Sequence, residues 1–272
     1  MPVKQRLMKK IESIALLRNG VIRLKNKLYL RGNTFEVSDI HFQRNTVDMQ
    51  GKEQTFSCCK ESYLRGGVVR MMGERNKVSI GVQTVIGGSD GQAFFICGND
   101  NKIIVGARCR INETTFFIRG HGNTIMLGDD CSAHLAEFHV EGDGNIIQLG
   151  NGVTMHGRGN GSIHLAADEG SGIYIDDDCM IAHSVQMRST DSHSIVDLNG
   201  KRLNPAADIR IGRHVWLGMQ SIILKGCEIA PNTMVAAGSV CAARTERVSN
   251  CILAGNPAKV VKRDVNWDRK FI

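Results

Sequence analysis

The sequence is poor in proline and aromatic residues, and it contains no long apolar run. Its 272 residues include 4 prolines, and 5% are aromatic. So few aromatic side chains argue against a surface on which nucleic-acid bases stack. Since no run of about 18 apolar residues occurs, we expect no membrane-spanning helix. The 30 glycines must therefore supply most of the turns.

The chain also lacks a CxxC pair, the commonest cysteine spacing of a zinc site. Its nine cysteines are odd in number, and the N-terminal residues lack the small-residue cleavage site of a secretory signal. These features favour a reducing compartment, so we expect a cytoplasmic protein without bound metal. Four cysteines occupy small-residue positions of a repeat, where cysteine is a compact apolar filler: Cys109, Cys131, Cys179 and Cys227.

The formal net charge is +7 with histidine neutral. A positive charge of this size attracts nucleic acid, membrane surfaces and anionic small molecules. Because the charges are scattered and aromatic residues are few, no nucleic-acid partner is expected. Residues 1–20 are predicted to form a short amphipathic helix with a basic face. That face leaves weak contact with a membrane surface as an alternative.

Residues 211–240 carry an aliphatic residue at every sixth position. The aliphatic residues are Ile211, Leu217, Ile223, Ile229 and Val235. A small or β-branched residue follows each one four positions later. Neither a helix, with apolar residues at i, i+3, i+4 and i+7, nor an alternating strand predicts this spacing. Three six-residue sides close a triangular coil of about 18 residues, and stacked coils bury their aliphatic residues in inner columns.

A related phrase recurs upstream at a longer period. NKVSIG, NKIIVG, NTIMLG and NIIQLG begin at Asn76, Asn101, Asn123 and Asn145. Repetition at a nearly fixed period is typical of a solenoid. We therefore expect an all-β parallel coil over residues 75–265. Residues 21–74 are predicted to be irregular strands or a cap, and residues 266–272 a C-terminal tail.

The six-residue period is interrupted once, at about 188–208. A loop of this length inside a tight solenoid is more often functional than not. It contains Ser189, Asp191 and His193. Histidine titrates near neutral pH and suits a general base, so the loop is the first candidate for a catalytic segment.

Three phrases in order carry a family resemblance: STDSH at 189–193, IGRHVWLG at 211–218 and GNPAKVVKR at 255–263. On this repeat background they resemble the hexapeptide-repeat acetyltransferases, most closely the surface-polysaccharide and galactoside-type O-acetyltransferases. The resemblance implies a left-handed parallel β-helix. It also implies a homotrimer with its active sites between subunits.

The resemblance further implies roles for individual residues. His193 is the expected general base, oriented by Asp191 or by a backbone carbonyl. Trp216 is expected to wall the acetyl site, and His183 and Ser189 to line the acceptor site. Acetyl-CoA is the expected donor. The residues expected to contact it are Ala237, Gly238 and Ser239 along the pantetheine arm, and Arg244, Lys259 and Lys262 at the phosphates.

The function expected from these features is acetyl transfer to a hydroxyl of a carbohydrate, a cell-surface polysaccharide or its precursor. Three alternatives stay open at the level of sequence. One is N-acylation of an amino sugar. Another is a zinc carbonic anhydrase-like β-helix, to which His183 and His193 would supply two of three ligands. The third is a scaffold without catalytic activity.

Overall fold

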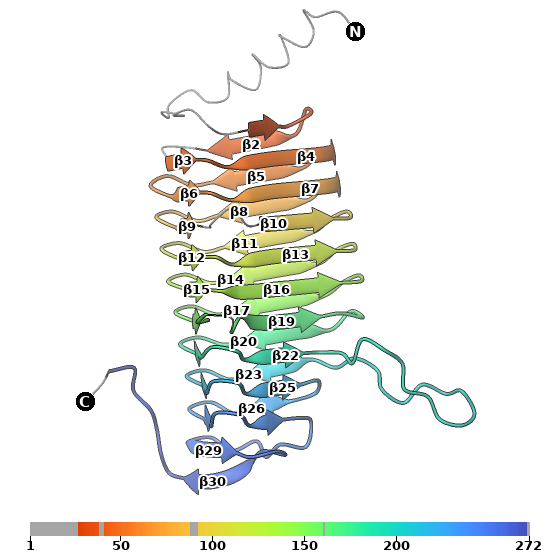
Figure 1. Ribbon diagram of the computed structural model, residues 1–272, viewed down its shortest axis with the longest axis vertical. Helices are drawn as coiled ribbons and strands as arrows, with labels where there is room; N and C mark the ends of the chain where they lie inside the picture. Colours follow the sequence, from red (N-terminus) through yellow and green to blue (C-terminus); the bar gives the residue numbers. More distant parts are fainter. Residues whose placement is uncertain (1–26, 38–40, 88–91, 160, 271–272) are drawn as a thin grey trace, which may run out of the picture.

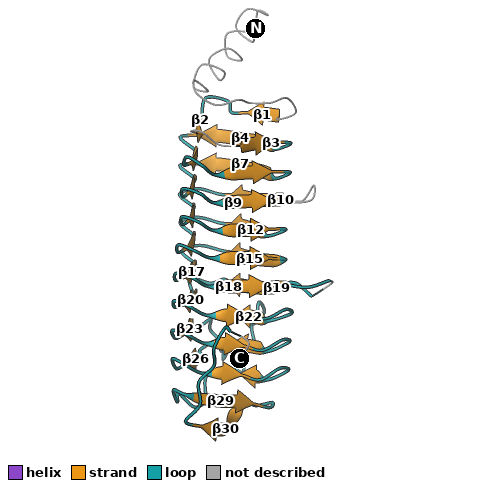
Figure 2. Ribbon diagram, turned by 90° about the vertical axis from the view of Figure 1, so that its left-hand side faces the viewer, coloured by secondary structure: helices purple, strands orange, loops and turns teal. Residues whose placement is uncertain are grey.

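The computed structural model describes residues 27–37, 41–87, 92–159 and 161–270. These residues wind into a triangular solenoid of about ten turns, with one strand on each of three faces per turn (Figures 1 and 2). All neighbouring strands within a face run parallel except β29 and β30, which are antiparallel. No helix in the described residues is long and apolar enough to cross a membrane.

The first face holds β1 (Lys27–Tyr29), β4 (Thr46–Lys52), β7 (Val68–Glu74), β10 (Gln92–Cys97), β13 (Thr115–Arg119), β16 (Ala136–Glu141), β19 (Ile163–Ala167), β22 (Gln186–Arg188), β25 (Ile222–Leu224) and β28 (Val240–Cys241). The second face holds β2 (Thr34–Val37), β5 (Thr55–Cys58), β8 (Lys77–Ile80), β11 (Lys102–Val105), β14 (Thr124–Leu127), β17 (Ile146–Leu149), β20 (Gly172–Ile175), β23 (Ile209–Ile211) and β26 (Glu228–Ile229). The third face holds β3 (His41–Gln43), β6 (Tyr63–Arg65), β9 (Val85–Gly87), β12 (Arg110–Asn112), β15 (Ser132–His134), β18 (Thr154–His156), β21 (Met180–Ile181), β24 (Trp216–Leu217), β27 (Met234–Val235), β29 (Cys251–Ala254) and β30 (Lys259–Arg263).

The inner columns predicted from the six-residue period are confirmed. Each aliphatic residue of that period is at most 3% exposed. The four cysteines of the repeat are buried and unpaired. Aromatic residues extend the column toward the N-terminus, where Phe94, Phe116 and Phe138 stack with ring centroids 5.0 and 4.9 Å apart. That distance matches the spacing of about 4.8 Å between neighbouring strands, so the stack follows directly from the register.

The asparagines of the upstream phrase form a buried ladder at the corner between the first and second faces. The Asn123 side-chain nitrogen donates to Asn101 Oδ1 at 3.1 Å and to the Gly142 carbonyl at 2.8 Å. In turn, Asn123 Oδ1 accepts from both nitrogens of Asn145, at 2.8 and 3.0 Å. Asn101, Asn123 and Asn145 are fully buried. The ladder thus satisfies polar groups that the turn would otherwise bury without partners.

The segment expected to be irregular has a regular structure in its described part. From Lys27 onward, its strands pair in parallel with those that follow, and Met49 faces Met71 in the same register as later coils. The helix expected over residues 1–20 lies outside the described residues.

The predicted interruption of the period is a protruding loop, residues 189–208, between β22 and β23. It leaves the corner between the first and second faces and extends away from the solenoid (Figure 1). Across this excursion the coils stay in register, since Met187 still faces Ile223 and Ile173 faces Ile209.

Replacing Asn123 by alanine tests the corner ladder. We expect Asn123→Ala to destabilise the solenoid by about 2–4 kcal/mol, because it leaves partners on two neighbouring coils buried and unpaired. Urea unfolding followed by circular dichroism measures the effect. Lys77→Ala, on an exposed strand position, is the control; equal unfolding midpoints for the two variants would contradict the role given to the ladder.

Candidate active site

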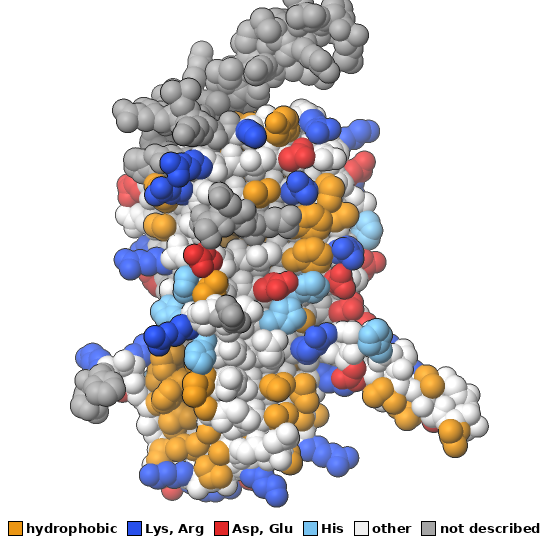
Figure 3. Space-filling model, viewed as in Figure 1, with side chains coloured by type: hydrophobic (Ala, Val, Ile, Leu, Met, Phe, Trp, Pro, Cys, Tyr) orange, Lys and Arg blue, Asp and Glu red, His pale blue; other side chains and the backbone are white. Residues whose placement is uncertain are grey.

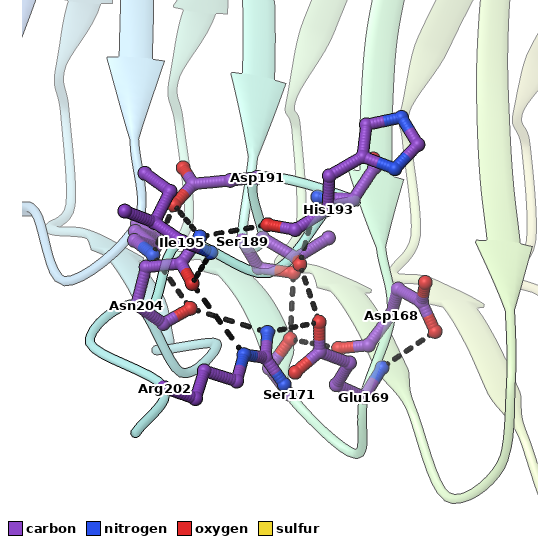
Figure 4. A network of polar contacts seen from close by, with 12 residues as sticks. Asp168, Glu169, Ser171, Ser189, Asp191, His193, Ile195, Arg202 and Asn204 are labelled. Atoms are coloured by element: carbon purple, nitrogen blue, oxygen red, sulfur yellow. Dashed lines mark hydrogen bonds and ion pairs between the residues drawn. The ribbon is translucent and has the colours of Figure 1, made fainter. Parts of the chain in front are cut away.

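The base of the loop is fixed to the solenoid by a network of polar contacts (Figure 4). The Asp191 carboxylate accepts hydrogen bonds from Lys225 and from the Asn204 side chain, and these bonds lower the pKa of Asp191. Glu169 accepts from Arg202 at 2.7 Å and from Thr190 at 2.9 Å, and both bonds lower the pKa of Glu169. The loop is therefore held at both of its ends by charge-assisted bonds.

His193 is carried on the outer surface of this network. Its backbone carbonyl accepts a hydrogen bond from Asn204 at 2.8 Å, while its ring points away from the labelled residues in Figure 4. Within the described chain the ring has no hydrogen-bond partner, and His193 is exposed. Asp191 forms no hydrogen bond with this imidazole in the described chain, and its Oδ2 accepts from Lys225 and Asn204; its expected role in orienting His193 stays a prediction. Asp191 fixes the loop backbone that carries His193.

The expectation that Ser189 lines the acceptor site does not fit the structure. Its side chain is fully buried, and its hydroxyl lies 2.6 Å from that of Ser171, where the corner ladder continues past Asn145. A buried hydroxyl in this position anchors the start of the loop and does not line an acceptor site.

Trp216 lies on the third face, in an almost wholly apolar groove of about 540 Å³. Residues lining this groove are Ala182, His183, Trp216, Gly218, Met219, Met234, Val235, Ala236, Ala237 and Ile252. Gly218 sets its floor, since a Cβ there would come within 2.6 Å of the Val235 carbonyl oxygen. Nδ1 of His183 is buried without a hydrogen-bond partner among the described residues. The groove thus brings Trp216, His183 and Ala237 together.

A second groove, of about 720 Å³, continues from the first toward the N-terminus. It shares Ala182, His183 and Trp216 with the first groove and adds polar and basic residues. The added polar and basic residues are His134, Thr154, His156, Arg158 and Arg269.

The structure does not bring His193 and Trp216 together within one chain. The loop leaves between the first and second faces, whereas Trp216 is on β24 of the third face. Labelled strands of that face, such as β12 and β15, lie on the other side of the solenoid from the loop in Figure 1. Neither groove contains a loop residue. For the same reason His183 and His193 are not neighbours in one chain. A single copy therefore carries two separate halves of the expected site.

The three small residues expected along the pantetheine arm differ in their exposure. Ala237 lines the groove, and Gly238 is exposed with open space where a side chain would extend. The Ser239 side chain is 1% exposed and its hydroxyl accepts a hydrogen bond from the Gly255 backbone nitrogen, so its proposed contact with the donor is wrong.

Basic side chains gather at the β30 end of the solenoid, below an apolar area on the third face (Figure 3). Arg244, Lys259 and Lys262 are exposed. None of the three forms an ion pair with another residue that the structure describes, in contrast to Arg263, which pairs with Glu246. These three cations are thus available to a phosphate group.

One part of the site was missed from the sequence: a C-terminal strap, residues 264–270, that folds back on the third-face side. Trp267 stacks on His214 with ring centroids 4.1 Å apart and is 7% exposed. Its indole nitrogen donates to the His214 carbonyl at 2.9 Å, and its own carbonyl faces His214 Nε2 at 3.0 Å. Trp267 also lies 6.1 Å from Trp216, so the strap supports one wall of the groove.

Arg269 and Asp178 complete the attachment of the strap. Arg269 donates to the Asp178 carboxylate at 2.8 Å and to Thr154 at 2.7 Å. The other Asp178 oxygen lies 2.6 Å from His214 Nδ1. Burial raises the pKa of Asp178, but the bonds from His214 and Arg269 outweigh it and the pKa is lowered. Both His214 nitrogens thus face oxygen atoms, which fixes the orientation of the ring under the strap.

Comparison with known proteins agrees with this architecture. Residues 208–243 match the family described as bacterial transferase hexapeptide (six repeats). The resemblance to hexapeptide-repeat acetyltransferases and the left-handed parallel β-helix predicted with it are confirmed.

The names of the similar proteins describe acetyltransferases. The polysialic acid O-acetyltransferase of Neisseria meningitidis is 38% identical over 114 residues, which are 42% of this chain and 52% of that protein. The chain thus matches about half the length of that relative. The crystal structure of the polysialic acid O-acetyltransferase OatWY aligns with a TM-score of 0.63 and 28% identity, over 85% of this chain and 93% of that one. For the polySia specific acetyltransferase NeuO the values are 0.59 and 27%, over 83% of each chain.

The strap can be tested by hydrogen exchange. Trp267→Ala removes the stack on His214 and one hydrogen bond, so we expect amides of residues 264–270 to exchange about a hundredfold faster or more. Mass spectrometry of exchange at peptide level measures this change. Lys270→Ala is the matched control, because its exposed side chain has no partner in the described structure. Unchanged exchange in Trp267→Ala would contradict the role of the stack.

Proposed function

We propose that this protein is an O-acetyltransferase that moves an acetyl group from acetyl-CoA to a hydroxyl of a carbohydrate. The proposal rests on two features of one solenoid, an exposed imidazole on a fixed loop and an apolar groove with a tryptophan, and on the similarity of this solenoid to two polysialic acid O-acetyltransferases. The acceptor we propose is polysialic acid or a related anionic polymer, modified in the cytoplasm.

Charge along the second groove supports an anionic polymer as acceptor. The cationic Arg158 lines it beyond Trp216, in the direction of the N-terminal coils, beside the polar side chains of His134 and His156. An extended groove with basic side chains attracts a chain of negative charges more than a small neutral sugar.

A second copy of the chain would complete the site. The tip of the loop exposes four apolar side chains: Ile195, Val196, Leu198 and Leu203, which are 52–106% exposed. Burying such a tip against an apolar groove is favourable. We therefore propose a closed trimer in which the loop of each chain lies over the third-face groove of the next, so that His193 meets the partner subunit's Trp216.

In this arrangement His193 accepts the proton of the acceptor hydroxyl as its oxygen attacks the thioester carbonyl. The C–S bond then breaks, and the imidazolium returns the proton to the departing thiolate, so that an O-acetyl sugar and a free thiol are formed. No acyl-enzyme is needed, because the thioester is already activated. Ala237 and Gly238 leave room for the thin pantetheine arm. Arg244, Lys259 and Lys262 would hold the phosphates of acetyl-CoA.

Replacing His193 tests the base. We expect His193→Ala to lower kcat/KM by about 100- to 10,000-fold, because the hydroxyl proton then has no acceptor. Thiol release from acetyl-CoA in the presence of polysialic acid measures the rate. Ser194→Ala, the exposed neighbour on the same loop, is expected to keep full activity. Full activity in both variants would remove His193 from the mechanism.

Mixing two inactive variants tests the shared site. His193→Ala and Trp216→Ala homo-oligomers should both be impaired. Co-expressed in equal amounts, they should form mixed trimers in which about a quarter of the sites combine an intact His193 with an intact Trp216. Recovery of about that share of the wild-type activity is expected. No recovery in trimers shown by native mass spectrometry to be mixed would contradict a site built from two chains.

A further inference from the structure

Three side chains that commonly bind metals converge on the first face, away from both halves of the candidate site. Glu137 and His139 lie on β16, and His164 lies on the adjacent strand β19. One donor atom of each side chain lies within 4.8 Å of the donors of the other two. In the sequence the two histidines are 25 residues apart, so no local pattern points to this cluster.

The fold enforces this convergence. Glu137 and His139 are two residues apart on one strand and so point to the same side. His164 faces Glu137 directly across the parallel ladder. The register is fixed from within, because Phe138 and Leu165 face each other in the core and are fully buried. A slip of either strand by one residue would turn its buried residue outward.

The rings are also held from outside. His139 stacks on Phe117 with ring centroids 4.6 Å apart and an angle of 17°. Its Nδ1 lies 3.0 Å from Glu137 Oε1. The His164 ring stands edge-on to that of His139, at 5.7 Å and 61°. Two tetrahedral zinc ligands at ordinary bond lengths are separated by about 3.3 Å, so the His139–Glu137 pair already has nearly the spacing that a shared ion requires.

The chemistry of the three side chains also favours zinc. Two imidazoles and one carboxylate form a donor set typical of Zn²⁺, with a fourth position left for water.

We propose that Glu137, His139 and His164 bind one Zn²⁺ ion. The ion would take the place of the proton shared between His139 and Glu137 and would join β16 to β19. That clamp lies one coil before β22, the strand that leads into the loop. The proposal does not depend on acetyl transfer, since its three residues belong to neither the loop nor the third-face grooves.

Zinc titration of the metal-stripped, tag-free full chain tests the site. Calorimetry should show one Zn²⁺ bound per chain, and zinc should raise the melting temperature. Co²⁺ should give the visible absorption bands of a tetrahedral site. Glu137→Gln, His139→Ala and His164→Ala should each weaken zinc binding about tenfold or more, and should reduce the zinc-induced rise in melting temperature.

His134→Ala and His156→Ala are matched controls, because these histidines face each other on adjacent strands of the third face in the same way. They should bind zinc like the wild type. Melting of each metal-free variant checks its fold, and Glu137→Gln preserves side-chain size. The proposal is overturned if the wild type binds no stoichiometric zinc, if the three site variants bind like the wild type, or if the controls lose binding equally.

Discussion

The parallel hydrogen-bond ladder between successive coils is the constraint on which the rest of this structure depends. Each coil exposes an apolar inner face that only its neighbours can cover, so stability and register are set together. The buried asparagine ladder fixes the corner, and the stacked phenylalanines fix the interior. Outward side chains are consequently arranged in columns with a spacing of about 4.8 Å. The apolar groove at Trp216 and the Glu137–His164 pair are both products of that regular spacing.

The same ladder explains how a long loop can leave the solenoid without disturbing it. A coil pairs with the coils above and below it, so residues inserted at a corner interrupt no pairing, and Met187 meets Ile223 as it would without the loop. A few charge-assisted hydrogen bonds at the base of the loop then hold it in place. Lys225, from the next coil, holds Asp191, and Arg202 bridges back to Glu169. His193 is thus presented from a fixed base.

The periodic part of the structure was predictable from the sequence, whereas much of the site was not. A repeat determines which residues point inward, and its one interruption locates the loop. Single residues are harder, because Ser189 and Ser239 look like groove residues in the sequence but their hydroxyls satisfy corner backbone and side-chain partners. The strap joins Arg269 to Thr154, 115 residues away, and no local pattern encodes such a contact. His193 and Trp216 lie on different sides because the chain runs along the second face and turns a further corner between them.

The separation of His193 from Trp216 within one chain suits the proposed polymeric acceptor. An internal unit of a long polymer cannot enter a closed pocket end-on, so its hydroxyl must be reached from the side along an open groove. A base on an arm from another copy can cover such a groove and leave both ends free for the polymer. Discrimination between acceptors would then come from residues spaced along the solenoid axis, and the basic groove beside Trp216 provides them. Five further strands precede β18 on the third face, and at about 4.8 Å per strand they form a surface longer than one sugar.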